Sequence, residues 1–457
     1  MRPPMLKPIQ LKNGLTVLKL PRSGAKNFIV GFVACTGASV ENHFHQGVSY
    51  LVERMFHYGT DKHPSPRYLH TALEGMGAKF YSETTHELTH YYLSVPSNHQ
   101  FKAISVLSEI IQHSYFDEQD LQKEKRLQID TLNYMAGGPS SSAISQQALD
   151  NLYYGTPLSF PLRGAIDSLV SVTRDDLLTY LDHQYKPSTS FLVIAGDFET
   201  KNVMDLITQE WGYWNPKNKP HQTNPEESFA VQGQLPRIMY KQRGQSHTDV
   251  TFAFVLDQGY QPSLQGIEAQ HAEDVDLEEL KEEHLERTAR VLVLNTLLGQ
   301  GYTSRLWIKG VEDEMFFNNI HSEVVPFKYT SYLQITGVTS NSQFTFALEA
   351  VLSVLDALKQ TTVSINELAK AKEYLKGQLI LDHEDLFFAT YWQMAHYVGS
   401  ELEYDLEDLL AAIKKVDAAA LRALALDIFV PHRLTITTVG TAKETRIVDK
   451  LITKYLA

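Results

Sequence analysis

The 457-residue sequence is poor in three features that mark large classes of proteins. It has one cysteine, Cys35, which excludes an internal disulfide and a zinc site built from several thiolates. No apolar run approaches the ~18 residues that span a bilayer, so we expect no membrane-spanning segment. The 41 Lys and Arg are outnumbered by 54 Asp and Glu, and the resulting net charge of −13 argues against nucleic acid as a partner.

What is present is typical of a folded, multidomain chain, with 43% hydrophobic and 11% aromatic residues. The first residues lack the apolar stretch of a signal peptide, which predicts a cytoplasmic protein, or a periplasmic or organellar one if the N-terminus is incomplete. Nine acids and one base lie in the acidic segment 268–286. This segment predicts a solvated loop that leads into an exposed helix, with a docking surface for a basic partner as the alternative.

The sequence also contains an internal repeat. Asp120–Lys125 (D-L-Q-K-E-K) matches Glu367–Lys372 (E-L-A-K-A-K) at an offset of 247 residues. Leu169, Val172, Leu177 and Gly196 match Ile413, Val416, Leu421 and Gly440, always at an offset of 244. Similar offsets in two separate places predict two homologous domains rather than three unrelated ones.

A stretch rich in Pro, Asn and charge separates the two halves and is typical of a linker. The predicted organisation is a first domain over residues 1–214, a linker over 215–236 and a second domain over 237–457. Each half opens with strand-like sequence and continues with helical periodicity, without strict strand–helix alternation. This mixture predicts an α+β fold in which each half is a mixed or antiparallel sheet covered by helices.

One motif is misleading. His86–His90 reads H-E-L-T-H and matches the zinc-binding H-E-x-x-H pattern, which requires a helix. Its surroundings are aromatic and β-branched and end at Pro96, which indicates a strand. On a strand the two imidazoles would lie ~13 Å apart, too far for one zinc ion. We therefore predict a strand with two solvent-facing histidines.

The segment Gly47–Thr60 reads G-V-S-Y-L-V-E-R-M-F-H-Y-G-T and predicts an amphipathic helix that ends near Gly59. It resembles the pattern G-x-x-H-F-L-E-H-M-x-F-x-G-T of the active-site helix in the pitrilysin/insulinase family of inverted-zincin metallopeptidases. Leu11–Leu15, Thr84–Tyr91 and Leu298–Leu306 match further patterns of this family. The resemblance covers essentially the whole chain, and it implies a duplicated chain that forms half of a clamshell.

Carried over to this sequence, the family's active site is degenerate. The two zinc-binding histidines fall on Tyr50 and Arg54, the third ligand falls on Thr131, and the general base falls on Glu53. A phenol, a permanent cation and a neutral hydroxyl do not form a ligand set for catalytic zinc. We expect no metal here, an idle Glu53, and an Arg54 whose charge meets a nearby carboxylate.

Two alternatives bear on this expectation. His57, His43 and His45 lie close enough in sequence to rebuild a metal site and so to give an active peptidase with non-standard ligands. We regard satisfied or exposed histidines as the better interpretation. The family's substrate-orienting arginine and tyrosine fall on Val311 and Asn318, so this pair is missing as well.

The resemblance therefore implies a pseudo-peptidase. Its expected role is that of the non-catalytic subunit of a heterodimeric metallopeptidase whose partner carries the zinc, with a homodimer as an alternative. A structural subunit, like the core proteins of respiratory complexes, is the second hypothesis. We expect peptides to bind along a strand edge formed by Phe80, Tyr81, Ser82, Glu83 and Thr84.

Overall fold

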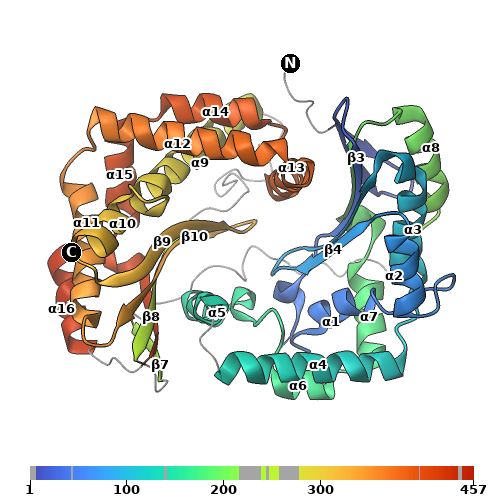
Figure 1. Ribbon diagram of the computed structural model, residues 1–457, viewed down its shortest axis with the longest axis horizontal. Helices are drawn as coiled ribbons and strands as arrows, with labels where there is room; N and C mark the ends of the chain where they lie inside the picture. The colour runs from blue at the N-terminus through green and yellow to red at the C-terminus, as the bar shows by residue number, and fades with distance from the viewer. Residues whose placement is uncertain are drawn as a thin grey trace, which may run out of the picture. The chain divides into compact units, whose positions relative to one another are not determined.

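The computed structural model describes residues 7–42, 45–137, 141–215, 238–242, 246–256, 277–400, 402–440 and 445–456. Its internal contacts divide the chain into two compact units (Figure 1). Unit 1 comprises residues 1–138, 160–228 and 382–398, and unit 2 comprises residues 139–159, 229–381 and 399–457. Neither unit is contiguous, because each takes a segment from the other half of the sequence. The contiguous boundaries inferred from sequence stay a prediction, and the linker 215–236 lies almost wholly outside the described residues.

Unit 1 is built on a six-stranded mixed sheet with the order β1-β2-β6-β3-β5-β4. Its strands are β1 (Lys7–Gln10), β2 (Thr16–Pro21), β3 (Asn27–Ala34), β4 (Lys79–Thr84), β5 (Thr89–Pro96) and β6 (Ser190–Gly196). β2 and β6 run parallel and the other neighbours run antiparallel. Among the described residues β4 is the edge strand at one end.

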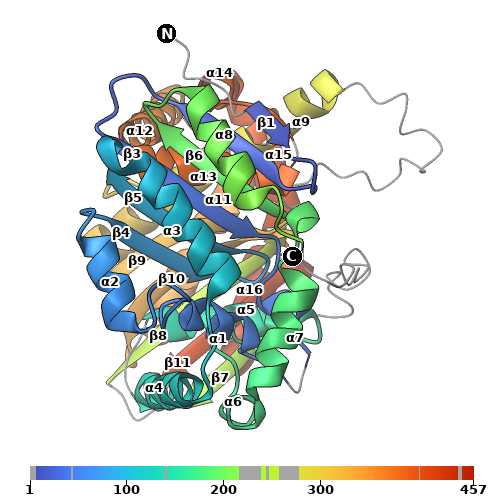
Figure 2. The ribbon, with the colours of Figure 1, turned by 90° about the vertical axis from the view of Figure 1, so that its right-hand side faces the viewer.

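Helices cover both faces of this sheet, as the alternation of side chains requires. The helices are α1 (Val48–Met55), α2 (Pro66–Glu74), α3 (Gln100–His113), α4 (Glu118–Gly137), α6 (Ile166–Ser171), α7 (Arg174–Gln184), α8 (Thr200–Trp211) and α13 (Leu386–Ser400). Val17, Phe32 and Ile194 pack toward α1, α3, α7 and α8, and α3 and α8 lie side by side over the sheet in Figure 2. Leu18 and Val33 face the other way and pack on α13. The core of unit 1 is therefore completed by a helix from the second half of the sequence.

Unit 2 repeats this architecture with the strand order β7-β11-β8-β10-β9. Its strands are β7 (Ile238–Gln242), β8 (His247–Leu256), β9 (Phe317–Pro326), β10 (Ser331–Ser340) and β11 (Leu434–Gly440). β7 and β11 run parallel and the other neighbours run antiparallel, as in unit 1. Its helices are α5 (Ser141–Leu152), α9 (Leu277–Gly299), α10 (Arg305–Trp307), α11 (Phe344–Gln360), α12 (Ile365–Glu384), α14 (Leu406–Lys415), α15 (Ala418–Ile428) and α16 (Thr445–Leu456).

The bounds of the elements confirm the duplication that the sequence repeat predicts. α4 and α12 have the same length and are separated by 247 residues at both ends. α7 and α15, and likewise β6 and β11, correspond at an offset of 244. The predicted fold class, two homologous α+β halves with helix-covered mixed sheets, is confirmed.

Two further expectations concern surfaces. In the acidic segment 268–286, residues 277–286 form the exposed start of α9, where Glu282 pairs with Lys415 at 2.6 Å, and the preceding residues lie outside the described ones. In the part of the chain that the structure describes, no helix is both long and apolar enough to cross a membrane.

Candidate functional site

Helix α1 is fixed at its start by a buried acid. Gly47, at the N-cap, has a φ of +90°, a conformation that favours glycine. The Glu41 carboxylate accepts hydrogen bonds from the backbone N–H groups of Gly47 at 2.7 Å and Ser49 at 2.8 Å, and from the Ser49 hydroxyl. Burial nevertheless raises the pKa of Glu41 to about 7, although these hydrogen bonds oppose the rise.

One face of α1 carries the predicted site residues. Tyr50, Glu53 and Arg54 are spaced i, i+3 and i+4, and His57 follows just after the helix. Figure 1 shows α1 between the edge strand β4 and the long helix α4, and contacts join α1 to both. The side chains on this face therefore meet β4 on one side and α4 on the other.

Glu53 is directed at the edge strand. Its carboxylate accepts hydrogen bonds from the hydroxyls of Ser82 at 2.6 Å and Thr84 at 3.1 Å, and the residue is 3% exposed. Burial raises its pKa, while the two hydroxyls and the charges of Arg54 and Arg163 lower it. Both carboxylate oxygens thus hold the helix to β4.

His57 continues this network rather than joining a metal site. Its Nε2 lies 2.8 Å from the Ser82 hydroxyl oxygen. Because the single hydroxyl hydrogen of Ser82 is directed to Glu53, the histidine is the donor and its proton lies on Nε2. Burial, together with the charges of Arg54 and His70, lowers the pKa of His57 to about 3, so the imidazole is neutral at physiological pH.

Arg54 turns the other way and meets a buried acid on α4. Its Nε lies 3.2 Å from Glu124 Oε1, and the Tyr58 hydroxyl donates to Glu124 Oε2 at 2.8 Å. The expected ion pair of Arg54 with a nearby carboxylate is confirmed. The sequence did not identify Glu124 as the partner, because it lies 70 residues away on another helix.

The other two positions to which the family resemblance assigns zinc ligands also contact protein groups. The Tyr50 hydroxyl accepts a hydrogen bond from Arg163 Nη1 at 2.5 Å, and the Arg163 guanidinium carbon lies 4.7 Å from the centre of the Tyr50 ring. The Thr131 hydroxyl donates to the carbonyl of Leu127 in the preceding turn of α4 at 2.8 Å. Sequence reasoning gave no signal for Arg163, which lies 113 residues from Tyr50 in the chain.

These donor groups do not fit a zinc ion. Catalytic zinc takes about three lone-pair donors from the protein, whereas here the positions hold a phenol, a guanidinium and a neutral hydroxyl. The described residues contain no group of three or more His, Cys, Asp and Glu arranged to hold a metal. Of the histidines considered as replacements, His45 lies 3.5 Å from Asp176, and His43 lies outside the described residues.

The H-E-x-x-H segment is not helical, but one prediction about it is wrong. His86 lies in the turn between β4 and β5, and His90 lies on β5. Both are buried, at 4% and 3% exposure, rather than solvent-facing. His86 Nε2 lies 3.1 Å from the carbonyl of Phe160, and the His90 ring packs against Tyr391 of α13. The sequence could not show this because α13 comes from the second half of the chain.

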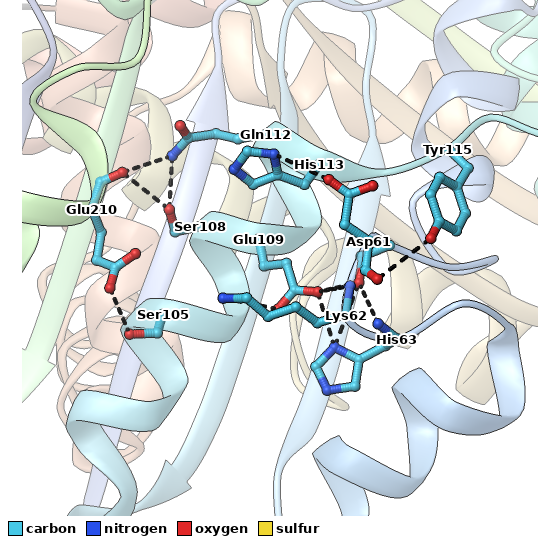
Figure 3. Close-up of polar contacts among 11 residues, drawn as sticks. Asp61, Lys62, His63, Ser105, Ser108, Glu109, Gln112, His113, Tyr115 and Glu210 are labelled. Carbon is cyan, nitrogen blue, oxygen red and sulfur yellow. Dashed lines mark hydrogen bonds and ion pairs between the residues drawn. The ribbon is translucent and has the colours of Figure 1, made fainter.

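The segment that follows α1 is anchored by a second buried acid, Glu109 of α3 (Figure 3). One of its oxygens accepts from the Thr60 hydroxyl, from the Lys62 backbone N–H at 3.0 Å and from His63 Nδ1 at 3.1 Å. Glu41 before the helix and Glu109 after it therefore fix both ends of the α1 region. Buried hydrogen bonds therefore set the orientation of the α1 face.

The remaining predicted positions are located as follows. Phe80, Tyr81, Ser82, Glu83 and Thr84 all lie on β4, and Ser82 and Thr84 point to Glu53. Val311 lies in a single turn of π-helix, Ile308–Asp313, and Asn318 lies near the start of β9. Their predicted roles toward a substrate stay predictions.

Two protein-family models match this chain. Residues 18–165 match the model described as insulinase (peptidase family M16), and residues 171–375 match the model described as the peptidase M16 inactive domain. The chain belongs to the insulinase family of peptidases, M16. Within this M16 chain, the first match contains α1, α4 and β4, and the second begins in α6 and ends in α12.

Several proteins resemble this M16 chain over different lengths. An uncharacterized zinc protease of Bacillus subtilis, YmxG, is 26% identical over 93% of this chain and 96% of its own length. Human mitochondrial-processing peptidase subunit beta is 27% identical over 44% of this chain and 41% of its own. Bovine cytochrome b-c1 complex subunit 1 is 28% identical over 44% of this chain and 42% of its own. The mitochondrial matches thus span less than half of those proteins.

Solved structures share the fold. A protease from Helicobacter pylori superposes with a TM-score of 0.81 at 16% identity, over 96% of this chain and 100% of its own. A peptidase M16 inactive domain from Pseudomonas fluorescens gives a TM-score of 0.81 at 17% identity, over 96% and 99%. At these identities the similarity shows the fold alone.

Proposed function

We propose that this chain is a zinc-free, catalytically inactive M16 homologue that binds peptides as the non-catalytic subunit of a metallopeptidase. Its partner would be an active subunit of the same family that carries the zinc, with a second copy of this chain as the alternative. The observation that carries the proposal is the state of the three ligand positions. Tyr50 accepts a hydrogen bond from Arg163, and Arg54 forms an ion pair with Glu124. Thr131 donates a hydrogen bond within its own helix.

The retained acid supports the same conclusion. A general base in a zinc peptidase must reach a metal-bound water, whereas both oxygens of Glu53 accept hydrogen bonds from β4. An active peptidase with non-standard ligands would need His57 as a ligand. The Nε2 of His57 is instead the donor to Ser82. Glu53 and His57 therefore act as structural groups in this proposal.

Peptide binding is proposed on the basis of strand β4. In the described part of unit 1, β4 ends the sheet, and its outer edge presents backbone groups that can pair with an extended chain. Phe80 to Thr84 occupy this edge, as the sequence analysis expected. Strand addition at β4 would place a peptide beside the face of α1 that carries Tyr50 and Arg54.

The test is to purify the full chain alone and with a co-expressed M16 subunit that carries the intact zinc motif. Zinc content and cleavage of an unfolded peptide are measured for both samples. The proposal predicts no turnover and no zinc for the chain alone, and zinc with turnover for the pair. Stoichiometric zinc with turnover by the chain alone would contradict it.

A variant with the family's ligands restored tests the assignment of the three positions. The triple substitution Tyr50→His, Arg54→His and Thr131→Glu is expected to bind zinc, because it restores three lone-pair donors. Glu124→Gln is added in a second variant, since removal of Arg54 leaves Glu124 without its cation. If both variants fold and neither takes up zinc, the assignment of the ligand positions is wrong.

A scaffold role is the second candidate, and one comparison favours it. Bovine cytochrome b-c1 complex subunit 1, by name a subunit of a larger complex, is 28% identical to this chain over 206 residues. A scaffold subunit would bind partner proteins and show no affinity for extended peptides. Peptide-binding measurements on the full chain therefore distinguish the two roles.

A further inference from the structure

Two arginines, Arg54 and Arg163, lie at the face of α1 that carries Tyr50, and each uses only part of its guanidinium group. Arg54 contacts Glu124 through Nε, which leaves Nη1 and Nη2 without a partner among the described residues, and its side chain is 37% exposed. Arg163 donates from Nη1 to Tyr50, and its Nη2 has no described partner. Because the guanidinium is a planar fork of donors, each arginine can still take an anionic oxygen.

The two groups lie in one neighbourhood. Arg163 lies over the ring of Tyr50, which is one helical turn from Arg54 on the same face of α1. The charges of both arginines lower the pKa of Glu53, which lies between Tyr50 and Arg54 in the sequence. Two positive charges therefore lie near the face of α1 that carries Tyr50 and Arg54, and strand addition at β4 would place a peptide beside this face.

Glu53 and Glu124 are already engaged by other groups. The Glu124 carboxylate accepts hydrogen bonds from Arg54 and Tyr58. The Glu53 carboxylate accepts hydrogen bonds from Ser82 and Thr84. Neither has an oxygen that lacks a hydrogen bond from the described residues. An incoming carboxylate would thus add to the donor groups of Arg54 and Arg163 without displacing an internal ion pair.

The adjoining face of α4 exposes two large apolar side chains. Glu124, Leu127, Thr131 and Tyr134 follow one another along one face of this helix at helical spacing. Leu127 is 58% exposed and Tyr134 is 81% exposed. Large apolar side chains that are exposed beside a charged anchor favour a hydrophobic residue on the bound peptide.

We propose that Arg54 and Arg163 bind the C-terminal carboxylate of an extended peptide that lies along β4 and ends in a hydrophobic residue. The inference rests on the proposed peptide-binding function and names the class of ligand. A guanidinium binds a carboxylate by two parallel N–H···O bonds, which gives both charge and geometry. The site thus selects free chain ends.

The test measures binding of fluorescein-labelled, unstructured decapeptides to the full chain by fluorescence anisotropy. One peptide ends in leucine with a free carboxylate, a second is its C-terminal amide, and a third is an amide whose last residue is glutamate. We expect the free acid to bind about tenfold more tightly than either amide, as one or two charge-assisted hydrogen bonds allow. Equal binding of the acid and the leucine amide would overturn this inference and leave the proposed peptide-binding function intact.

The other outcomes are also decisive. If the glutamate amide binds as tightly as the free acid, the site takes any carboxylate and the preference for a chain end is wrong. If no peptide binds at about 1 mM, both the inference and the peptide-binding role are overturned.

Variants show whether the two arginines supply the preference. Arg163→Gln and Arg54→Lys are each expected to reduce the ratio of acid to amide affinity by about fivefold to tenfold. Arg126→Gln, which removes an exposed arginine of α4, is the matched control and should leave the ratio unchanged. Arg163→Gln removes no buried ion pair, so it keeps the test valid if the Arg54 variant unfolds. An unchanged ratio in folded Arg163→Gln would contradict the assignment.

Discussion

The two units attach a helix to their edge strand in the same way but with different chemistry. In unit 1 the Ser82 hydroxyl of β4 donates to Glu53 of α1 at 2.6 Å. In unit 2 the Ser322 hydroxyl of β9 donates to the side-chain oxygen of Asn295 of α9, also at 2.6 Å. β4 and β9 hold the same place in the two strand orders. The acceptor of the serine hydrogen bond is thus a neutral amide in unit 2 and an ionisable carboxyl group in unit 1.

The difference predicts that this helix–strand contact can form without an acid at position 53. An acceptor oxygen on the helix and a serine on the strand are sufficient. Each unit also has an arginine–glutamate ion pair, and the two pairs differ in their number of contacts. Arg305 of α10 binds Glu367 of α12 with two contacts, at 2.7 and 2.9 Å, whereas Arg54 commits one nitrogen to Glu124 of α4. Arg54 therefore commits fewer of its donor groups to its acid than Arg305 does.

The largest expected effect comes from breaking the two ion pairs. Arg54→Ala leaves Glu124, whose side chain is 6% exposed, without its cation and should cost about 3 kcal/mol in the free energy of unfolding. Arg305→Ala should cost about 1 kcal/mol, because the Glu367 side chain is 25% exposed and can be solvated. Urea unfolding of both variants measures the difference. A larger loss in Arg305→Ala would contradict it.

The next effect is a pH dependence that belongs to unit 1. Glu41 has a folded-state pKa of about 7 against an ordinary value of 4.5, so the folded chain holds its proton more tightly. Its contribution to stability is complete below pH 4.5 and is lost as the pH rises through 7, by up to about 3 kcal/mol. Glu41→Gln should remove this slope. Unfolding free energies of both proteins at pH 5 and pH 8 test this, and equal slopes would refute it.

A smaller effect is expected from removing the two serine hydroxyls. Ser82→Ala removes a donor to the buried Glu53 and the acceptor of His57, and should cost about 2 kcal/mol. Ser322→Ala removes a hydrogen bond to a neutral amide and should cost about 1 kcal/mol. Hydrogen exchange of α1 and α9 would locate each loss. Equal costs would mean that the acid makes no difference to this contact.

The smallest effect is expected from Glu53→Gln, which makes unit 1 resemble unit 2 at this contact. The amide oxygen can accept from Ser82 and the amide nitrogen can donate to Thr84, so stability should change by less than about 1 kcal/mol. Because burial raises the pKa of Glu53, the variant should gain stability relative to the wild type as the pH rises. Melting temperatures at pH 6 and pH 8 test this. A marked loss of stability at both values would show that the acid is required.

Much of the fold could be predicted from sequence because it depends on spacing. The two sequence offsets identified α4 and α12, and likewise β6 and β11, as equivalent elements of the two halves. Apolar periodicity indicated where helices occur. Positions 50, 53 and 54 could be placed on one face because helical geometry is local. Their partners could not be found, since Glu124, Arg163 and Ser82 approach only through the tertiary fold.

The same limit explains the wrong prediction for His86 and His90. Strand sequence alone does not show which face is covered, and the helix over His90 begins at Leu386. The non-contiguous units have the same origin, because residues 382–398 complete the core of unit 1.

The zinc content of the full chain decides whether the site on α1 holds a metal. The chain is expressed with zinc in the medium, passed through gel filtration and analysed for metal by mass spectrometry, beside the variant with Tyr50→His, Arg54→His and Thr131→Glu. We predict background zinc in the wild type and a gain in the variant. One zinc ion per wild-type chain, removed by Glu53→Gln and Tyr50→Phe, would contradict the account.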